Sequence, residues 1–331
     1  MGIYVNPTGR SFELAINSEI FVDKSGLIKE TNKCINTLQR YMCVSRPRRF
    51  GKSMAMDMLS AYYGRKTDAE NLFKGLKISH DESYDRHINK YDVLKINMQD
   101  FLSVTHSVDD MLKMLCEYIT DDFSIECKDI IFRDKSNIVR VMQDVFMSTG
   151  RPFVILIDDV FAETKCQFVI LIDEWDCLFR EYKQDKEAQK KYLDFLRGWL
   201  KDKDYIALAY MTGILPIKKY GSHSALNMFT EYSMTDMGAL AEYFGFTDDE
   251  VKELLHYYGQ DTHYETVKEW YDGYRFGNVD VYCPWDVIQY CKSLYLDVSA
   301  KPQDFWSNSS GNAIVRRFID KADISTRNEI E

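Results

Sequence analysis

The segment that most constrains the fold of this chain is a loop at residues 45–53, Ser-Arg-Pro-Arg-Arg-Phe-Gly-Lys-Ser. It follows a short apolar run at residues 41–44 and precedes apolar residues at helical spacing that end at Gly64. The first N–H groups of a helix have no partners within it, and the helix dipole adds partial positive charge, so this position attracts anions. Strand, turn and helix together predict a phosphate-binding loop of the Walker A type.

Individual residues of the loop have the chemistry that a nucleotide needs. Lys52 can reach the β- and γ-phosphates, the Ser53 hydroxyl can ligate Mg²⁺, and Gly51 lets the backbone approach the phosphates. The motif is incomplete, because Arg46 stands where the standard pattern has its first glycine. An ordinary basic turn is therefore the alternative. The residues expected to contact the nucleotide are Arg48, Arg49, Phe50, Gly51, Lys52, Ser53 and Met54.

The other half of the predicted site is a Walker B segment at residues 168–174, Phe-Val-Ile-Leu-Ile-Asp-Glu. Consecutive apolar residues indicate a strand buried on both faces of a parallel sheet, and open α/β sheets bind ligands at the carboxyl ends of their strands. Asp173 is expected to hold Mg²⁺, and Glu174 to orient the water that attacks the γ-phosphate. A strand ending in solvated acids is the alternative. The two halves together predict ATP and Mg²⁺ as ligands.

A tandem duplication precedes this strand. Residues 144–158 are followed directly by a near copy at residues 159–173, with ten of fifteen positions identical. The chain therefore has two candidate carboxylate strands, at residues 153–158 and 168–173. We assign the site to the second copy, because it is followed by Glu174 whereas the first is followed by the shorter Asp159. The first copy is then expected to be an edge strand or a displaced apolar segment.

A further buried strand is predicted at residues 205–213, and Thr212 near its end is expected to sense the γ-phosphate or hold the attacking water. A threonine that caps the strand end is the alternative. From about residue 225 the pattern becomes helical, with a capping box at residues 247–250 and a helix opened by Pro284. We therefore expect a P-loop domain at residues 1–225 and a small helical lid domain at residues 226–331.

Composition excludes several classes of protein. The formal net charge of −10 gives no overall attraction to nucleic acid or anionic lipid. The N-terminus has no signal-peptide pattern and no apolar run is long enough to span a membrane, so no membrane partner is expected. The eight cysteines form no C-x-x-C pair, which favours reduced thiols in a cytoplasmic protein over a disulfide framework or a zinc site.

Five segments together resemble the AAA-ATPase-like family of predicted prokaryotic P-loop ATPases. They are residues 21–24, 45–53, 168–176, 212–217 and 270–276. Arg46 in the first glycine position is usual in that family. The resemblance implies an α/β P-loop NTPase fold of the additional-strand type, with a parallel central sheet followed by a helical region. In that fold the Thr212 strand lies between the phosphate-loop strand and the Asp173 strand.

The resemblance also implies roles and partners. Lys52, Ser53, Asp173 and Glu174 take the phosphate, magnesium and water-activating roles, and the partners expected besides ATP are further copies of the chain and a nuclease or another DNA-associated protein. Many relatives carry a C-terminal domain similar to PD-(D/E)XK nucleases, and this chain stops where that domain would begin. The candidates for completing a neighbour's site are Arg275, Arg316 and Arg317.

Three functions fit these residues. The first is a Mg²⁺-dependent ATPase that couples nucleotide turnover to conformational change and regulates a nuclease or a DNA-associated partner. The second is a nucleotide-gated interaction module that binds ATP with little or no hydrolysis. The third is a P-loop kinase, which suits the residues less well, because Glu174 is better suited to activate water than to serve transfer to a substrate hydroxyl.

Overall fold

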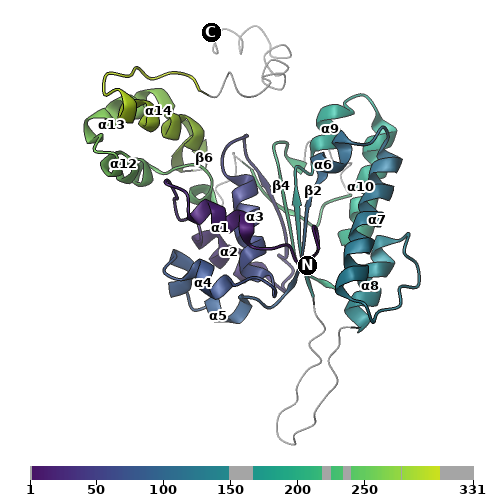
Figure 1. The fold of residues 1–331 in the computed structure, drawn as a ribbon. Coiled ribbons are helices and arrows are strands. Elements are labelled where there is room, and N and C mark those ends of the chain that lie inside the picture. Colours follow the sequence, from purple (N-terminus) through teal and green to yellow (C-terminus); the bar gives the residue numbers. More distant parts are fainter. Residues whose placement is uncertain (1, 149–166, 218–224, 234–239, 277, 306–331) are drawn as a thin grey trace, which may run out of the picture. The chain divides into compact units, whose positions relative to one another are not determined.

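The structure is a computed structural model of the 331-residue chain, and it describes residues 2–148, 167–217, 225–233, 240–276 and 278–305 (Figure 1). The chain divides into two compact units, Met1–Phe244 and Gly245–Glu331. The boundary that we expected at residues 225/226 falls inside the first unit. The reason is a short strand at residues 230–232, which pairs with the phosphate-loop strand and so belongs to its sheet.

A parallel five-stranded sheet, as far as the described residues go, forms the centre of the first unit, in the order β2-β3-β4-β1-β5. The strands are β1 (Tyr41–Ser45), β2 (Asp92–Asn97), β3 (Phe168–Asp173), β4 (Ile206–Gly213) and β5 (Thr230–Tyr232). All residues of β1, β3 and β4 are buried, as their apolar runs predict for strands covered on both faces. Because β4 lies between β1 and β3, the expected additional-strand P-loop fold is confirmed.

Helices cover both faces of this sheet (Figure 1). On one side lie α1 (Arg10–Ile16), α2 (Gly26–Cys34), α3 (Lys52–Tyr63), α4 (Ala69–Phe73) and α5 (Tyr84–His87). On the other lie α6 (Met98–Ser103), α7 (Val108–Glu126), α8 (Ile138–Ser148), α9 (Cys177–Glu181) and α10 (Lys186–Leu200). Alternate strand residues such as Cys43, Ile170 and Met211 pack into the apolar core under the second group, while α3 contacts β2, β3 and β4.

The start of the chain covers the outer edge of β2. Val5 forms an antiparallel bridge with Leu94, and the Asn6 N–H donates to the Val93 carbonyl oxygen at 2.7 Å. The Asp122 carboxylate of α7 accepts a hydrogen bond from the Val5 N–H at 3.1 Å and fixes this segment from the helical side. The β2 strand therefore has neighbours on both sides.

The duplicated segment contributes two different elements. The second copy supplies β3, and residues 144–148 of the first copy form the end of α8. Residues 149–158 of the first copy, including the expected strand at 153–158, lie outside the described residues.

The second unit combines helices with a hairpin. Its elements are α12 (Asp248–Tyr257), α13 (Tyr264–Tyr271), β6 (Asp272–Phe276), β7 (Val279–Tyr282) and α14 (Pro284–Leu296). The capping box between Thr247 and Glu250 and the helix opened by Pro284 are as predicted. The antiparallel pair β6–β7 is a hairpin that was not expected within the small helical domain. Its core includes Val251, Phe276 and Val287.

Within the described residues, the first unit has two short 3₁₀ helices, η1 (Lys77–His80) and η2 (Ala241–Tyr243), and the second has one, η3 (Asp261–His263). Among the helices of the described residues, none has both the length and the apolar character needed to cross a membrane.

Candidate active site

The predicted phosphate-binding loop joins β1 to α3. Arg49 (φ 69°) and Gly51 (φ 84°) have left-handed backbone conformations that turn the chain into the helix. The first hydrogen bond of the helical ladder runs from the Ala55 N–H to the Gly51 carbonyl at 2.9 Å, and no side chain caps the helix. The N–H groups of Lys52, Ser53 and Met54 precede that bond, so they are available to an anion.

The residues of the loop differ in how they could meet a nucleotide. Arg48 is exposed and Met54 is 49% exposed, so both side chains border the solvent at the helix start. Phe50 is fully buried, so its side chain anchors the loop and only its backbone faces a ligand. A Cβ on Gly51 would meet no described atom within 4 Å, so glycine is needed there for its positive φ rather than for space.

Lys52 lies inside the loop and is 5% exposed. Its Nζ donates to the carbonyl oxygens of Arg46 at 3.0 Å and of Pro47 at 2.9 Å. Burial lowers the pKa of the Lys52 ammonium, although the nearby carboxylates of Glu174 and Asp173 oppose this. The lysine therefore holds the loop together, and its ammonium lies within the loop that we predict to bind phosphates.

Arg46, which stands in the position of the usual first glycine of the loop, does not face this site. It is 2% exposed, and its Nη1 donates to the Ser45 carbonyl at 2.9 Å and to the Tyr232 carbonyl at 2.7 Å. Its guanidinium also lies over the Phe244 ring, 5.4 Å from the centroid. Arg46 thus ties the end of β1 to the end of β5. This replacement of the usual glycine has a structural role that the local sequence does not reveal.

The loop and the Walker B strand converge at Asp173. The Ser53 hydroxyl donates to Asp173 Oδ2 at 2.6 Å, across 120 positions of sequence. From the other side, the Thr212 hydroxyl donates to Asp173 Oδ1. Asp173 is 5% exposed and Thr212 is fully buried, whereas Ser53 is exposed. The carboxylate is therefore enclosed on the side of Thr212 and reaches the solvent border at Ser53, where β3 and β4 end.

Glu174 follows at a strained turn. Its φ of 52° is left-handed, which is unfavourable for a residue with a Cβ and which directs its side chain away from the strand. The carboxylate makes an ion pair with Arg180 of α9. Burial raises the pKa of Glu174, while the charges of Arg180 and Lys52 oppose the rise. Glu174 is therefore close to the loop but engaged by an arginine.

Asp176 and Arg180 are residues of this site that the sequence interpretation did not select. Asp176 is fully buried, and its Oδ2 accepts hydrogen bonds from the N–H groups of Ile214 at 3.1 Å and Leu215 at 2.8 Å. Arg180 Nε lies 3.6 Å from the same oxygen. The spacing of four residues within an acidic–apolar segment was the available signal, since i and i+4 side chains share one helix face.

The oxygen donors at Asp173 fit Mg²⁺. This ion prefers hard oxygen ligands and is commonly held by one or two carboxylates together with waters and substrate phosphates. Ser53 and Asp173 supply one hydroxyl and one carboxylate. Within the described residues, no group of three or more His, Cys, Asp or Glu residues could hold a metal by protein ligands alone. The donor set thus suits a metal that arrives with a phosphate ligand.

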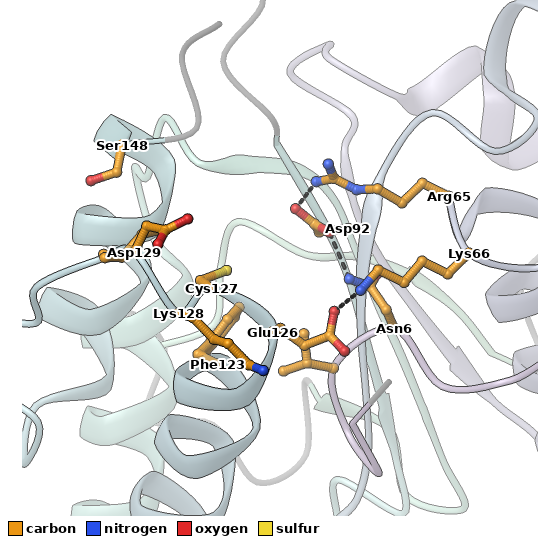
Figure 2. A pocket seen from close by; sticks show the side chains of 12 residues that line it. Asn6, Arg65, Lys66, Asp92, Phe123, Glu126, Cys127, Lys128, Asp129 and Ser148 are labelled. Carbon is orange, nitrogen blue, oxygen red and sulfur yellow. Dashed lines mark hydrogen bonds and ion pairs between the residues drawn. The ribbon is translucent and has the colours of Figure 1, made fainter.

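A separate cavity of about 310 Å³ lies at the amino-terminal end of β2, near the end of α7 (Figure 2). Two of the cations that line it are already paired, because Arg65 contacts Asp92 and Lys66 contacts Glu126. Asp92 is the first residue of β2, and Asn97, which pairs with Asp173, is the last. The cavity therefore lies at the amino-terminal ends of the strands, whereas the phosphate loop lies at their carboxyl ends. It is not part of the predicted nucleotide site.

Two of the three candidate arginines for a neighbour's site, Arg316 and Arg317, lie outside the described residues. Arg275 lies in β6 of the second unit, and its side chain is 67% exposed and contacts Asp280 at 3.7 Å.

Comparison with known proteins shows the family of the chain. The sequence pattern of a family described as predicted AAA-ATPase matches residues 10–222, which is more than half of the chain. The chain belongs to the predicted AAA-ATPase family. The resemblance drawn from the sequence is thereby confirmed, and membership of the predicted AAA-ATPase family supports a nucleotide-binding ATPase.

Several proteins resemble this predicted AAA-ATPase. A curated relative, described as an uncharacterized protein in the vnfD 5' region of Azotobacter chroococcum mcd 1, is 25% identical over 276 residues, or 81% of this chain and 47% of that protein. The chain thus spans about half the length of this relative. The crystal structure of the FIGL-1 AAA domain matches with a TM-score of 0.35 and 11% identity, covering 90% of this chain and 70% of that chain. The structure of Drosophila ORC bound to DNA matches with a TM-score of 0.35 and 9% identity, covering 87% and 54% respectively.

Proposed function

We propose that this chain is a Mg²⁺-dependent ATPase that hydrolyses ATP at the loop between β1 and α3. The observation that supports the proposal most directly is the 2.6 Å hydrogen bond between Ser53 Oγ and Asp173 Oδ2. It joins the predicted Walker A and Walker B segments, which are far apart in sequence, at the free amino end of α3. An anion-binding helix start next to a buried carboxylate is the arrangement that a nucleotide and its metal require.

Each residue has a defined task in this proposal. The N–H groups at the start of α3 and the Lys52 ammonium bind the phosphates and orient them. Ser53 and Asp173 hold the metal, and Thr212 keeps Asp173 in position through its hydroxyl. Bound Mg²⁺ would neutralise charge on the phosphate oxygens during transfer. Glu174 accepts a hydrogen bond from the attacking water and aligns it with the γ-phosphate.

Phosphate release from ATP, measured with and without Mg²⁺, tests the proposal. Glu174→Gln should bind a fluorescent ATP analogue as the wild type does but lose about two or more orders of magnitude in turnover, as expected for a residue that positions water. The matched control is Glu181→Gln, because Glu181 is an exposed glutamate at the end of α9. Equal rates for Glu174→Gln and the wild type would remove Glu174 from its role.

A second function is favoured by one observation, the ion pair of Glu174 with Arg180. A glutamate held in this way would leave an ATP-binding module with little turnover. Tight binding of ATP together with phosphate release no faster than from free nucleotide would favour this module over the ATPase. A wild-type protein indifferent to ATP would contradict both.

We also propose that the nucleotide cycle drives a conformational change that acts on a partner. The chain spans 47% of the length of its curated relative, so that partner can be a further part of a longer protein. The nuclease, the DNA-associated partner and the further copies of the chain stay predictions of the resemblance. A gel-shift experiment with a DNA duplex tests the DNA-associated role, and size-exclusion chromatography of the protein tests self-association. Each is run with and without ATP.

A further inference from the structure

Arg180 lies between two carboxylates at the carboxyl edge of the sheet. Its Nη2 makes the ion pair with Glu174, and its Nε lies 3.6 Å from Asp176 Oδ2. The side chain of Arg180 is 7% exposed and that of Asp176 is fully enclosed. One buried guanidinium therefore serves both the glutamate assigned to the water and a second, structural carboxylate.

Asp176 connects this arginine to the segment that follows β4. Its Oδ2 accepts the N–H groups of Ile214 and Leu215 at 3.1 and 2.8 Å. The segment begins directly after Thr212 and Gly213, the residues that end β4 beside Asp173. Asp176 thus contacts both Arg180 and the backbone segment that follows the candidate active site.

Three polar atoms in this group make no hydrogen bond within the described part of the chain: Arg180 Nε, Asp176 Oδ1 and Trp175 Nε1. All are buried, and buried polar atoms without partners are uncommon because they cost free energy. Two of them face one point, since a Cβ on Gly213 would lie 2.7 Å from Trp175 Nε1 and 2.8 Å from Asp176 Oδ1. The two N–H donors and the carboxylate acceptor of this group therefore lie close together without forming a hydrogen bond. This is expected if the group has a second arrangement in which they do bond.

We infer that Arg180 is a positioning residue that restrains Glu174 and transfers to Asp176 when Glu174 turns to the attacking water; this inference rests on the proposed ATPase function. While Glu174 is paired with Arg180, its carboxylate is engaged and cannot align a water. When the guanidinium moves to Asp176, it can form two parallel N–H···O hydrogen bonds with that carboxylate. These bonds would give partners to Arg180 Nε and Asp176 Oδ1, two of the three unpartnered atoms. Release of Glu174 is thus coupled to tighter binding of the carboxylate that holds Ile214 and Leu215.

Arg180→Met tests the restraint, because methionine fills similar space without a charge. We expect kcat for phosphate release to rise about ten- to a hundredfold. This is the factor by which a step is slowed if one hydrogen bond between charged groups must break first, and Arg180→Met removes that bond. The KM for ATP should stay close to the wild-type value, since the ion pairs of Arg180 are with Glu174 and Asp176 rather than with a residue of the phosphate loop. Arg180→Lys keeps a cation that can pair with Glu174 and should restore the low kcat.

Two further variants keep the test decisive. Arg180→Met alone leaves the buried Asp176 carboxylate without its cation, which costs stability. Arg180→Met combined with Asp176→Asn removes that charge, so the double variant should fold even if the single variant does not, and it should show the same rise in kcat. Arg197→Met is the matched control, because Arg197 is a half-exposed arginine of α10 whose contact is an ion pair with Asp194 at 3.2 Å. It should leave kcat and KM unchanged.

The outcomes separate the inference from the proposed function. If the wild type releases phosphate and a folded Arg180→Met protein releases it at the same or a lower rate, the inference alone is overturned. A silent wild type with an active Arg180→Met supports the inference and favours the ATP-binding module over the ATPase for the wild type. No release by either protein overturns the proposed function and the inference together.

Discussion

Replacement of Gly213 by alanine perturbs the most closely packed point of the candidate active site. Gly213 is the last residue of β4, and an added Cβ would lie 2.7 Å from Trp175 Nε1 and 2.8 Å from Asp176 Oδ1. Real Cβ atoms essentially never come this close to other atoms. Trp175 and Asp176 are both fully buried, so neither can move into solvent to make room.

The expected cost follows from two opposing effects. Overpacking a buried site costs about 1–3 kcal/mol, while the loss of glycine's freedom in the unfolded chain returns about 0.4–1 kcal/mol. At the midpoints of these two ranges, about 2 and about 0.7 kcal/mol, the net loss of unfolding free energy is about 1.3 kcal/mol. For a unit of this size, about 2–4 °C of Tm corresponds to each kcal/mol, so the Tm should fall by about 3–5 °C.

Gly198→Ala is the control for this prediction. Gly198 lies in α10, is exposed, and would place its new Cβ where no described atom comes within 4 Å. Alanine in a helix interior is favoured over glycine by about 0.5–1 kcal/mol, so this variant should unfold at a higher temperature than the wild type. Thermal unfolding followed by circular dichroism measures both. A Gly213→Ala protein at least as stable as the wild type, beside a stabilised Gly198→Ala, would refute the packing argument.

Two further predictions concern the second unit. Thr247→Ala removes the capping box with Glu250 and should destabilise α12 by about 1 kcal/mol, measured by urea unfolding of the second unit's signal; an unchanged midpoint would contradict the role of the cap. Burial opposes ionisation of Asp248, but hydrogen bonds from Lys252 and two tyrosines outweigh it and lower the pKa of the carboxyl to about 2. Because this lies below the unfolded value of about 3.9, the stabilisation is present above about pH 4 and lost as the pH falls towards 2. Asp248→Asn should therefore weaken the acid dependence of urea unfolding, and an unaltered acid dependence would count against this assignment.

The elements at the core of the site could be predicted from the sequence because their signals are local. The apolar run at residues 168–172 specifies a strand buried on both faces, whichever strands lie beside it. The Gly-Lys-Ser turn specifies a helix start, and Pro284 and the capping box mark helix starts in the second unit. The strand order, by contrast, came from the family resemblance.

The features that the sequence did not reveal depend on contacts between distant residues. In the sequence Arg46 is only a departure from the Walker A pattern, whereas in the structure its guanidinium donates a hydrogen bond to the carbonyl of Tyr232 from another strand. The pairing of Glu174 with Arg180 requires the left-handed turn at Glu174, which no local pattern announces. The β6–β7 hairpin was hidden because its residues 272–276 continue an aromatic segment that also suits a turn.

The segment at the start of the chain has a consequence for self-association. A strand at the border of a sheet exposes N–H and C=O groups that can recruit a strand from another molecule, and proteins commonly cover such borders. Val5 and Asn6 occupy this position beside β2, so growth of the sheet by addition of a foreign strand is blocked there. The opposite border is β5, which is only three residues long and offers a poor template. Removal of the first six residues would therefore expose the unpaired N–H and C=O groups of β2 and favour aggregation.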